Sequence, residues 1–580
     1  MVKKLMNHVG EYKKDSLLAP FFVTLEVIME IIIPFLMAKL IDNGLNRGDM
    51  RETLVLGAVM ALCTLVSLFF GVFSGKYAAS ASAGLAKNLR RDMYLSIQGF
   101  SFSTIDKFSS ASLVTRLTTD ITNVQNAYQM IVRIAVRGPV MMVLSLIMSL
   151  TISPGLSMIF LLAIPILGGA LYLIMIKAHP IFERVFNIYD RLNNVVQENL
   201  RGIRVVKSYV RETHEIKKFN TVSEEIYQDF TKAEKILAFN MPIMQLVVYT
   251  CMLLIAWFGA RYIVSGTLST GDLTSLIAYI MQILMSLMML SMVFVMIIMA
   301  RASAERIIAV LDETSDLKNN ASPVYTVSNG DIVFKNVSFS YASDPHKLSL
   351  NAINLTIKSG ETIGIIGGTG SAKSSLVQLI PRLYDTTEGS VFVGGVDVKN
   401  YDLETLRQAV AMVLQKNVLF SGTIAQNLRF GNPNASDSEL KRMCALACAD
   451  EFIEKMPEGL NTLIEQGGAN VSGGQKQRLC IARALLKKPK ILILDDSTSA
   501  VDTATDSKIR KAFRDEIPDT TKIIIAQRVS SIEDADKIII MKDGYINAIG
   551  THDTLLSENS IYKDVYYSQT KGEESYEITE

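Results

Sequence analysis

Cysteine is scarce in this sequence, and the five cysteines that occur are scattered along the chain. Two of them lie in long apolar runs, and the other three lie in the more polar C-terminal half. The sequence contains no C-x-x-C pair and no cluster of cysteine with histidine. A structural zinc site and a disulfide framework are therefore not indicated, and we expect free, buried thiols.

An excess of charge of one sign is also absent, because 58 Lys and Arg residues stand against 57 Asp and Glu residues. A formal net charge of +1 gives no indication of nucleic acid or of an acidic partner. The first apolar segment is not followed by the small-residue cleavage site of a signal peptide. We therefore interpret this segment as a first membrane helix.

Apolar residues are abundant and make up 49% of the 580 residues. An uninterrupted apolar run of about 20 residues is long enough to span a bilayer as a helix. The sequence predicts six such helices, of which the first is interrupted by charged residues and the third and fourth are separated by a turn at 151–155. They are expected within 17–40, 54–75, 138–176 (two helices), 236–260 and 273–300.

Lysine and arginine near the helix ends predict the orientation of the chain in the membrane. The N-terminus and the segments 76–127 and 177–235 are rich in both residues, whereas the connections between the other helix ends are short and poor in them. We expect both termini and both long segments on the cytosolic side, with the helices continuing past the membrane. The polar stretches 109–120 and 209–220 are expected to form the tips of these extensions and to contact a soluble domain.

Two carboxylates lie inside the first apolar segment. Glu26 and Glu30 are four residues apart, so they occupy one face of a helix. Buried carboxylates in a membrane are costly and are usually paired or functional. Arg133 and Arg137 have the same spacing and are candidate partners, and direct contact with a cationic substrate is the alternative.

Methionine is concentrated in the sixth predicted membrane helix. At 100° per residue, its methionines fall on a single stripe. The stripe contains Met281, Met285, Met288, Met289, Met292, Met296 and Met299. Methionine is flexible and polarisable, so it suits a surface that accepts ligands of many shapes. The alternative is helix packing or contact with lipid.

The C-terminal half contains a glycine-rich motif from Ile363 to Ser375, which reads I-G-I-I-G-G-T-G-S-A-K-S-S. A short buried strand followed by a glycine-rich turn, a lysine and a serine is typical of a phosphate-binding P-loop. Backbone amides cradle the phosphates, Lys373 adds charge and the Ser374 hydroxyl can hold Mg²⁺. The expected nucleotide-binding positions are Gly367, Gly368, Thr369, Gly370, Ser371, Ala372, Lys373, Ser374 and Ser375.

Other elements of a nucleotide site follow at compatible spacing. The apolar run 491–494 ends in Asp495, a carboxylate positioned to bind Mg²⁺ together with Ser374 and Gln415. Tyr341 lies upstream, where its ring can stack on adenine. The sequence V-S-G-G-Q precedes a helix and offers a hydroxyl and backbone amides to the γ-phosphate of a second nucleotide. Its residues after the valine are Ser472, Gly473, Gly474 and Gln475.

These motifs resemble those of the ABC transporters, whose signature is V-S-G-G-Q between the P-loop and the Walker B strand. Six membrane helices followed by one nucleotide-binding domain are similar to the layout of an ABC exporter half-transporter. The resemblance implies a helical membrane domain at 1–305, a linker at 306–330, an α/β P-loop domain at 331–570 and a disordered acidic tail at 571–580. It also implies two chains that together hold two ATP molecules and Mg²⁺.

Three positions around the γ-phosphate depart from this family's pattern. The residue after the Walker B aspartate is Asp496 where the family has glutamate, and the switch position is Gln527 where the family has histidine. The position before the P-loop lysine is Ala372 where the family has glycine. The chain therefore resembles the degenerate-site subunit of a heterodimeric exporter, whose signature completes the catalytic site on a partner that has glutamate and histidine.

The expected function is ATP-dependent efflux of amphipathic drugs or lipid-like compounds across a bacterial plasma membrane. The expected partners are a homologous half-transporter, membrane lipid and a small-molecule substrate. An ATP-gated channel, a regulatory subunit and an active homodimeric exporter are the alternatives. The candidate substrate contacts are Glu26, Glu30, Met281, Met285, Met288, Met292 and Met296.

Overall fold

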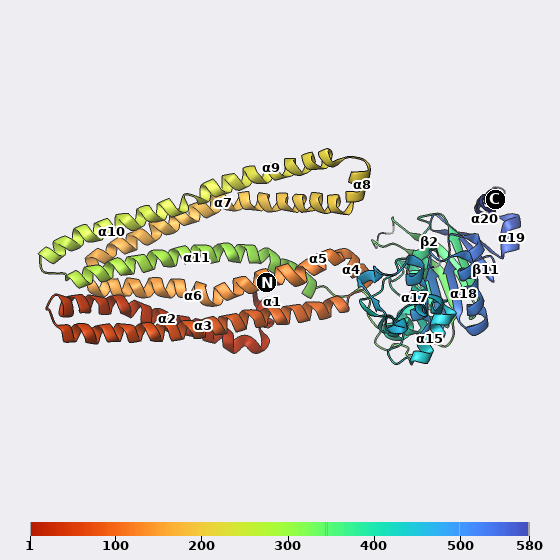
Figure 1. The fold of residues 1–580 in the computed structure, drawn as a ribbon, viewed down its shortest axis with the longest axis horizontal. Coiled ribbons are helices and arrows are strands. Elements are labelled where there is room, and N and C mark those ends of the chain that lie inside the picture. Colours follow the sequence, from red (N-terminus) through yellow and green to blue (C-terminus); the bar gives the residue numbers. More distant parts are fainter. Residues whose placement is uncertain (1, 343, 345, 498, 578–580) are drawn as a thin grey trace. The chain divides into compact units, whose positions relative to one another are not determined.

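The computed structural model describes residues 2–342, 344, 346–497 and 499–577 (Figure 1). The chain divides into two compact units. The first unit contains Met1–Gln98 and Ser110–Glu313, and the second contains Gly99–Ser109 and Thr314–Glu580. The second unit thus includes a short segment from the middle of the helical half.

The first unit is entirely helical where it is described. Its helices are α1 (Val2–Asn7), η1 (Gly10–Tyr12), α2 (Lys13–Lys39), η2 (Leu40–Leu45), α3 (Met50–Gln98), α5 (Ser110–Thr115), η3 (Arg116–Asp120), α6 (Ile121–Ile152), α7 (Pro154–Arg201), α8 (Ile203–Ser208), α9 (Glu212–Leu237), α10 (Asn240–Val264) and α11 (Thr270–Leu311). Within the described part, six helical stretches are long and apolar enough to cross a membrane, which confirms the predicted number. The predicted turn at 151–155 separates α6 from α7, because Ser153 is extended and Pro154 opens the next helix.

The tips of the two long extensions differ from the sequence prediction. The prediction placed the first tip at 109–120, but α3 ends at Gln98 and the turn lies at 99–109. Residues 110–120 are helical instead, because the buried Asp120 carboxylate accepts hydrogen bonds from Ser303 and Arg306 of α11. Their polarity therefore reflects contacts between helices and not a turn.

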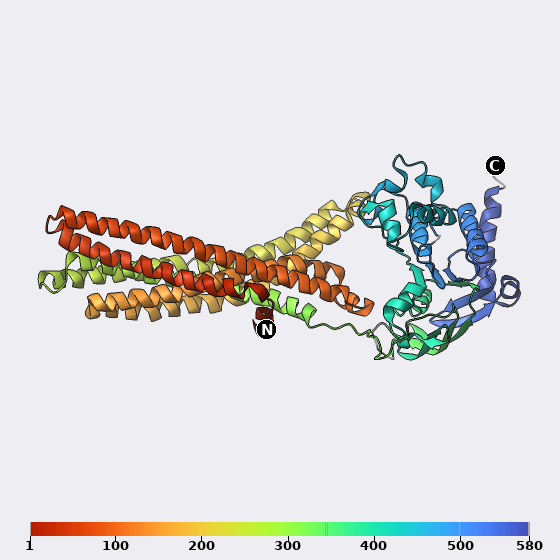
Figure 2. The same cartoon turned by 90° about the horizontal axis from the view of Figure 1, so that it is seen from below.

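The second tip is also displaced from the predicted position, 209–220. Here α7 ends at Arg201, the short α8 follows Gly202, and α9 begins at Glu212. Most of the stretch predicted as a tip is therefore the first part of α9. Figures 1 and 2 show α7 and α9 running side by side away from the other helices of this unit, with α8 joining them.

The remaining helices of the first unit pack through apolar side chains and a few polar contacts. Val23, Val27 and Ile31 of α2 form a buried cluster with Met141 of α6 and Tyr279 of α11. The Tyr279 hydroxyl donates a hydrogen bond to the Ile31 carbonyl oxygen at 2.9 Å. These contacts hold α2, α6 and α11 next to one another. Ser16 of α2 contacts Tyr128 of α6, and the later Glu26 contacts the later Arg137, so both helices run in the same direction. The two helices are therefore parallel.

The second unit is an α/β structure with two larger sheets. The six-stranded sheet has the order β12-β11-β3-β10-β9-β6, and the four-stranded antiparallel sheet has the order β2-β1-β4-β5. The strands are β1 (Ile332–Phe339), β2 (Leu350–Ile357), β3 (Thr362–Gly367), β4 (Glu388–Val393), β5 (Val396–Asp397), β6 (Val410–Val413), β7 (Gly422–Thr423), β8 (Leu463–Ile464), β9 (Ile491–Asp495), β10 (Thr521–Ile525), β11 (Lys537–Lys542) and β12 (Tyr545–Gly550). Together with the six membrane helices, this confirms the predicted fold class.

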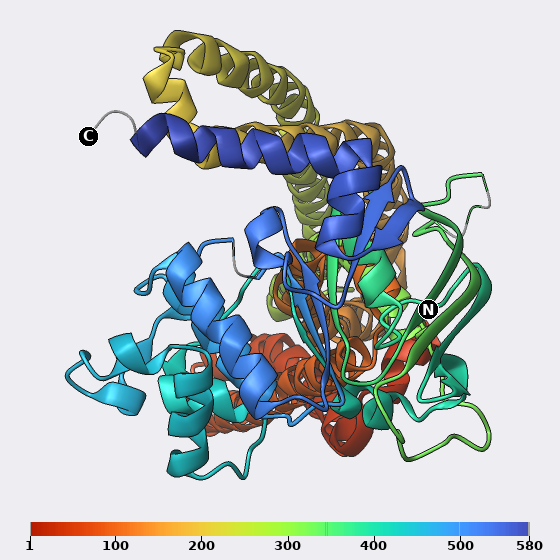
Figure 3. The ribbon, with the colours of Figure 1, turned by 90° about the vertical axis from the view of Figure 1, so that its right-hand side faces the viewer.

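Helices cover the sheets of this unit. They are α4 (Phe102–Phe108), α12 (Lys373–Gln378), η4 (Val398–Asn400), α13 (Leu403–Ala409), α14 (Ile424–Arg429), α15 (Asp437–Leu446), α16 (Asp450–Ile453), η5 (Gly459–Asn461), η6 (Gln466–Gly468), α17 (Gly473–Leu485), α18 (Thr503–Glu516), η7 (Val529–Ser531), α19 (His552–Glu558) and α20 (Ser560–Glu577). The tail predicted as disordered, 571–580, begins within α20, which is the blue helix ending at C in Figure 3. Residues 578–580 lie outside the described part of the chain.

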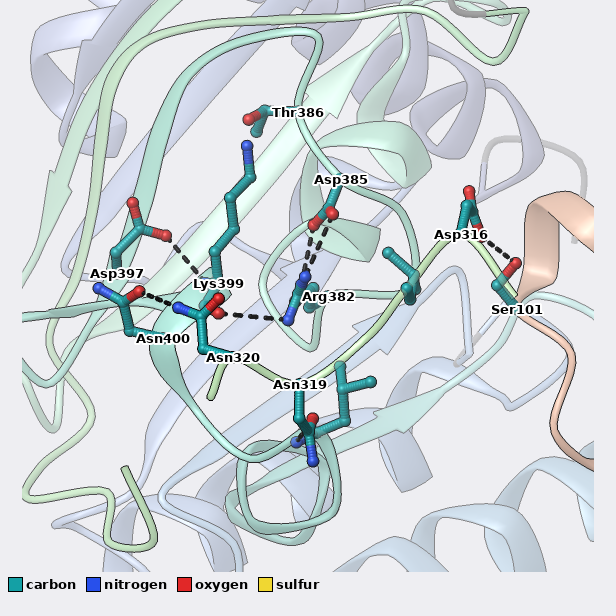
Figure 4. Close-up of polar contacts among 12 residues, drawn as sticks. Ser101, Asp316, Asn319, Asn320, Arg382, Asp385, Thr386, Asp397, Lys399 and Asn400 are labelled. Carbon is teal, nitrogen blue, oxygen red and sulfur yellow. Dashed lines mark hydrogen bonds and ion pairs between the residues drawn. The ribbon is translucent and has the colours of Figure 1, made fainter. Parts of the chain in front are cut away.

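The boundary between the two halves lies close to the predicted linker, 306–330. The last helix of the first unit, α11, continues to Leu311, and the second unit begins at Thr314. The chain then follows the surface of the α/β structure to β1. Asn319 donates to Asp402. Asn320 donates to Asn400 (Figure 4).

The segment 99–109 is attached to the second unit near this connection. Ser101 caps α4 and donates to the Asp316 carboxylate (Figure 4). Ser103 donates to the same carboxylate at 2.7 Å. Burial alone would raise the pKa of Asp316, but hydrogen bonds from the two serine hydroxyls and from backbone amides together outweigh burial and hold this pKa below its ordinary value. The negative charge at neutral pH therefore stabilises the attachment of α4.

Candidate functional site

Five strands of the six-stranded sheet are parallel and end at one edge, and four of them precede the nucleotide motifs. The strands β3, β10, β9 and β6 are parallel neighbours, and Ile525 pairs with both Ile365 and Asp495 in the sheet. Because carboxyl ends of parallel strands meet at one edge, the loops that follow them lie together. These loops carry the P-loop, Asp495, Gln415 and Gln527, so the structure brings the predicted nucleotide residues into one region.

The P-loop joins β3 to α12. Lys373 Nζ donates to the carbonyl oxygens of Gly367 and Gly368 at 2.8 and 2.9 Å. A Cβ at Gly367 would lie 2.2 Å from the carbonyl oxygen of Met541, so only glycine fits there. Burial lowers the pKa of Lys373, and the nearby Asp495 and Asp496 act in the opposite direction.

Ala372 adopts a backbone conformation that normally favours glycine. Its φ of 67° and ψ of 26° lie in the left-handed region. A residue with a Cβ pays roughly 1–2 kcal/mol for this conformation, whereas glycine adopts it freely. The departure from the family pattern at this position therefore has a structural cost within the loop itself.

Replacing Ala372 with glycine is expected to stabilise the protein by up to about 1 kcal/mol, because the strain disappears while the unfolded chain gains some freedom. The measurement is the thermal unfolding midpoint of the full chain in detergent. The matched control is Ala484→Gly within α17, which should destabilise the protein by about 1 kcal/mol. Equal destabilisation by both substitutions would contradict the strain at Ala372.

The residues predicted to hold a metal lie close to one another. Ser374 Oγ donates to Asp495 Oδ1 at 3.0 Å, and Asp495 is only 3% exposed. Burial raises the pKa of Asp495, whereas the hydrogen bond from Ser374 and the nearby Lys373 act in the opposite direction. Mg²⁺ commonly takes one or two protein oxygens together with phosphates and waters. This donor set fits Mg²⁺, and no cluster of three acidic, histidine or cysteine residues is found among the described residues.

Asp496 is held by two glutamine side chains. Gln527 Nε2 donates to Asp496 Oδ2 at 2.7 Å, and Gln415 Nε2 lies 3.5 Å from the same oxygen. The backbone of Asp496 has a φ of 50°, a conformation that aspartate tolerates better than most residues. The two residues that replace the family's glutamate and histidine, Asp496 and Gln527, are thus hydrogen-bonded to each other. The sequence alone did not indicate this contact.

Tyr341 lies beside the P-loop helix. Its hydroxyl forms hydrogen bonds with Ser375 Oγ at 2.9 Å and Gln378 Oε1 at 3.1 Å. Its ring is half-exposed and packs edge-on against Tyr384, at 5.1 Å between centroids. Tyr384 in turn donates to Asp106 of α4 at 2.8 Å.

Sequence reasoning missed Tyr384, although it links the predicted adenine-stacking residue to the segment 99–109. An aromatic residue at the end of a loop carries no motif that identifies such a contact in advance. Only the position of α4 against the α/β structure reveals it.

The signature residues form the start of α17. Ser472 Oγ accepts from the Gln475 backbone amide, and the Gln475 side chain accepts from the Ser472 amide, which is a capping box. A Cβ at Gly474 would lie 2.8 Å from the carbonyl oxygen of Ala500, whereas one at Gly473 would make an ordinary contact. Gln477, a residue that sequence reasoning did not identify, accepts a hydrogen bond from the Ala500 amide and so fixes this loop beside the signature.

The candidate substrate residues lie in the first unit, apart from the nucleotide motifs. Glu26 and Glu30 both pair with Arg137, at 2.5 and 2.7 Å. The prediction of an ion pair is thus fulfilled by Arg137 and not by Arg133. Contact of either carboxylate with a substrate stays a prediction.

The methionines of α11 form a partly exposed face. Met281, Met285, Met289 and Met292 are exposed, whereas Leu284, which flanks the stripe, is buried. Met288 packs partly against the cluster between α7, α10 and α11, and Met296 is half-buried. The side chain of Met299 lies outside the described residues. The stripe thus presents most of its length to the surface of this unit.

Comparison with known proteins agrees with both units. Residues 16–306 match the family described as "ABC transporter transmembrane region", and residues 350–499 match the family described as "ABC transporter". The chain is similar to the uncharacterized ABC transporter ATP-binding protein YfiB of Bacillus subtilis, with 37% identity over 98% of both chains. It is also similar to the uncharacterized ABC transporter ATP-binding protein Rv1273c of Mycobacterium tuberculosis, with 34% identity over 98% of both chains.

A solved structure of a bacterial Atm1-family ABC exporter with ATP bound has the same fold. Its TM-score is 0.84 at 23% identity, and the match covers 96% of this chain and 99% of that one. The six membrane helices and the α/β domain agree with the two family matches and with these relatives. The chain belongs to the ABC transporter family, and it joins one ABC transporter transmembrane region to one ABC transporter ATP-binding domain.

Proposed function

We propose that this chain is the degenerate-site half of a heterodimeric exporter. The complex moves amphipathic drugs or lipid-like compounds out of a bacterial cell, with its ATP-binding domains and both termini of this chain in the cytosol. The observation that carries the proposal is the hydrogen bond from Gln527 to Asp496. It occupies the carboxylate that would otherwise orient the attacking water.

The chemistry of these two residues supports slow hydrolysis. Aspartate is one methylene shorter than the family's glutamate, and a misplacement of about 1 Å can cost roughly 10²-fold in rate. Gln527 is neutral at every pH, so it lacks the positive charge that a protonated histidine carries. Its amide also donates a hydrogen bond to Asp496. The Ser374 and Asp495 pair remains intact, which supports binding of ATP with Mg²⁺ at a site of low turnover.

Exposed apolar surfaces on each unit support assembly with a second chain. In the first unit, the end of α8 exposes Val205, Tyr209 and Val210, of which Tyr209 is 74% exposed. In the second unit, Phe420 and Phe430 stack at 4.7 Å and are both exposed. Clustered apolar side chains of this kind usually mark contacts with other proteins. In the heterodimer, the signature of this chain then faces the ATP of its partner.

The substrate class rests on the methionine face of α11. A flexible, polarisable surface accommodates apolar molecules of different shapes better than a rigid one. In this proposal, residues 1–305 form the transport domain, 306–330 the linker, 331–570 the ATP-binding domain and 571–580 a tail. Met285, Met292 and Met296 then contact the transported compound.

The isolated chain is expected to bind MgATP and to hydrolyse it slowly. The test is purification of the full chain without a partner, followed by measurement of binding with a fluorescent ATP analogue and of steady-state ATP turnover. The control is Asp496→Asn, which should change little. Robust turnover that Asp496→Asn abolishes would identify an active homodimeric exporter instead, and ATP-dependent ion currents without uphill efflux would identify a channel.

A further inference from the structure

Two pairs of opposite charges occur at the same spacing on α2 and α6. Glu26 and Glu30 are one helical turn apart, and so are Arg133 and Arg137. The helices are parallel, since Ser16 of α2 contacts Tyr128 of α6 and Glu26 contacts Arg137 farther along. Two glutamates and two arginines in this arrangement can form two ion pairs in register.

The structure contains a different arrangement. Arg137 holds both glutamates, through Nη1 to Glu26 and through Nη2 to both oxygens of Glu30. Arg133 is half-buried, and among the described residues it has no ion pair or hydrogen bond. Its guanidinium lies beside Gly75 of α3, where a Cβ would be 3.6 Å from Nη1.

Glu26 is incompletely satisfied by this arrangement. The residue is only 7% exposed, and its Oε2 is buried without a hydrogen-bond partner among the described residues. An unpaired carboxylate oxygen and an unpaired guanidinium in an apolar bundle are both costly. Helix α3 comes close to Glu26 at Gly71, where an added Cβ would lie only 3.1 Å from Glu26 Oε1. Little space for another ligand therefore remains on that side of the carboxylate.

Arg133 can reach Glu26 by a geometry that already occurs in the structure. Arg137 and Glu30 are 107 residues apart, and Arg133 and Glu26 have the same separation. The Arg137–Glu30 pair shows that an arginine of α6 reaches a glutamate of α2 at this sequence separation while the two helices keep their present positions. The change on α6 is then confined to the Arg133 side chain, which turns from Gly75 toward Glu26.

We propose that Arg133 is the alternate partner of Glu26 in the transport cycle. In the second state Glu26 passes from Arg137 to Arg133, and Arg137 keeps Glu30, so that two ion pairs replace the shared one. The exchange depends on α3, because Gly71 and Gly75 of this helix lie next to Glu26 and Arg133 in the present state, with no side chain between them. The inference rests on the proposed function as an exporter.

The test separates the stability of the present state from turnover through the cycle. The variants are Arg133→Gln, Arg133→Lys, Arg137→Gln, Glu26→Gln and the double variant Glu26→Gln with Arg133→Gln. For each, we measure the thermal unfolding midpoint of the full chain without nucleotide, and ATP-driven efflux of a fluorescent amphipathic dye in vesicles from the native host. Arg301→Gln, which removes an exposed arginine of the same unit, is the control.

Arg137→Gln is expected to lower the unfolding midpoint by several degrees, because it leaves the partly buried Glu30 without its arginine and removes the present partner of the buried Glu26. Arg133→Gln is expected to leave the midpoint within about 1 °C and to slow efflux on the order of tenfold, since a charged hydrogen-bonded pair is lost only in the second state. Arg133→Lys should restore most of the efflux. The double variant should be no slower than the slower of its two single variants.

Wild-type efflux rates in Arg133→Gln would overturn this inference, as would a parallel loss of unfolding midpoint and efflux. Independent, multiplying effects of Glu26→Gln and Arg133→Gln would overturn it as well. Absence of ATP-driven efflux from wild-type vesicles is a separate outcome, because it contradicts the exporter proposal itself.

Discussion

The double substitution Ser472→Ala with Gly473→Asp is expected to lower the steady-state ATPase activity of the heterodimer by about 10²–10³-fold. The serine hydroxyl and the amides at the start of α17 are donors for the γ-phosphate of the ATP bound to the partner. Removing one donor and adding a negative charge opposes the charge that develops in the transition state. The measurement is ATP turnover and dye efflux by the assembled complex.

The choice of Gly473 follows from the structure. A side chain at Gly474 would collide with the carbonyl oxygen of Ala500, so its effect would mix phosphate contact with distortion of this chain. A Cβ at Gly473 lies 3.5 Å from that of Ala500 and is tolerated. The comparison variant is Lys373→Ala in this chain's own P-loop, which should cost less than tenfold in turnover because that site contributes little. A larger loss from Lys373→Ala would mean that the two composite sites are assigned in reverse.

The motifs that depend on local sequence were predictable. A P-loop, a buried strand that ends in aspartate and a signature before a helix each need a fixed order of residue types. Their assembly followed from the rule that parallel strands end at one edge, and the pairing of Ile525 with Asp495 agrees with it. The number of membrane helices was predictable too, because bilayer thickness sets a minimum apolar length.

Features that depend on packing between distant segments were not predictable. The polar stretch 109–120 looks like a turn in the sequence, but the buried Asp120 is paired with α11 and the stretch is helical. The choice of Arg137 over Arg133 depends on where α3 approaches, which spacing along one helix cannot reveal. The contact of Gln527 with Asp496 likewise required the structure, since the two residues lie on neighbouring loops.

This last contact leads to the second large effect. Asp496→Glu together with Gln527→His is expected to raise hydrolysis at this chain's own site by about 10²-fold, because the longer carboxylate reaches the attacking water and is no longer bound by the Gln527 amide. The pair must be changed together. Glutamate alone would meet the Gln527 amide, and histidine alone would leave the shorter carboxylate in place.

The signature variant provides a background in which this site can be measured alone. In a complex that carries Ser472→Ala and Gly473→Asp, the partner's ATP is hydrolysed poorly, whereas the site on this chain still faces an intact partner signature. Adding Asp496→Glu and Gln527→His should therefore restore turnover that the signature variant has lost. Asp496→Asn with Gln527→His is the matched control, since asparagine tolerates the left-handed backbone equally well and supplies no base. If turnover stays low, the strained backbone at Ala372 limits the site, and adding Ala372→Gly should then release it.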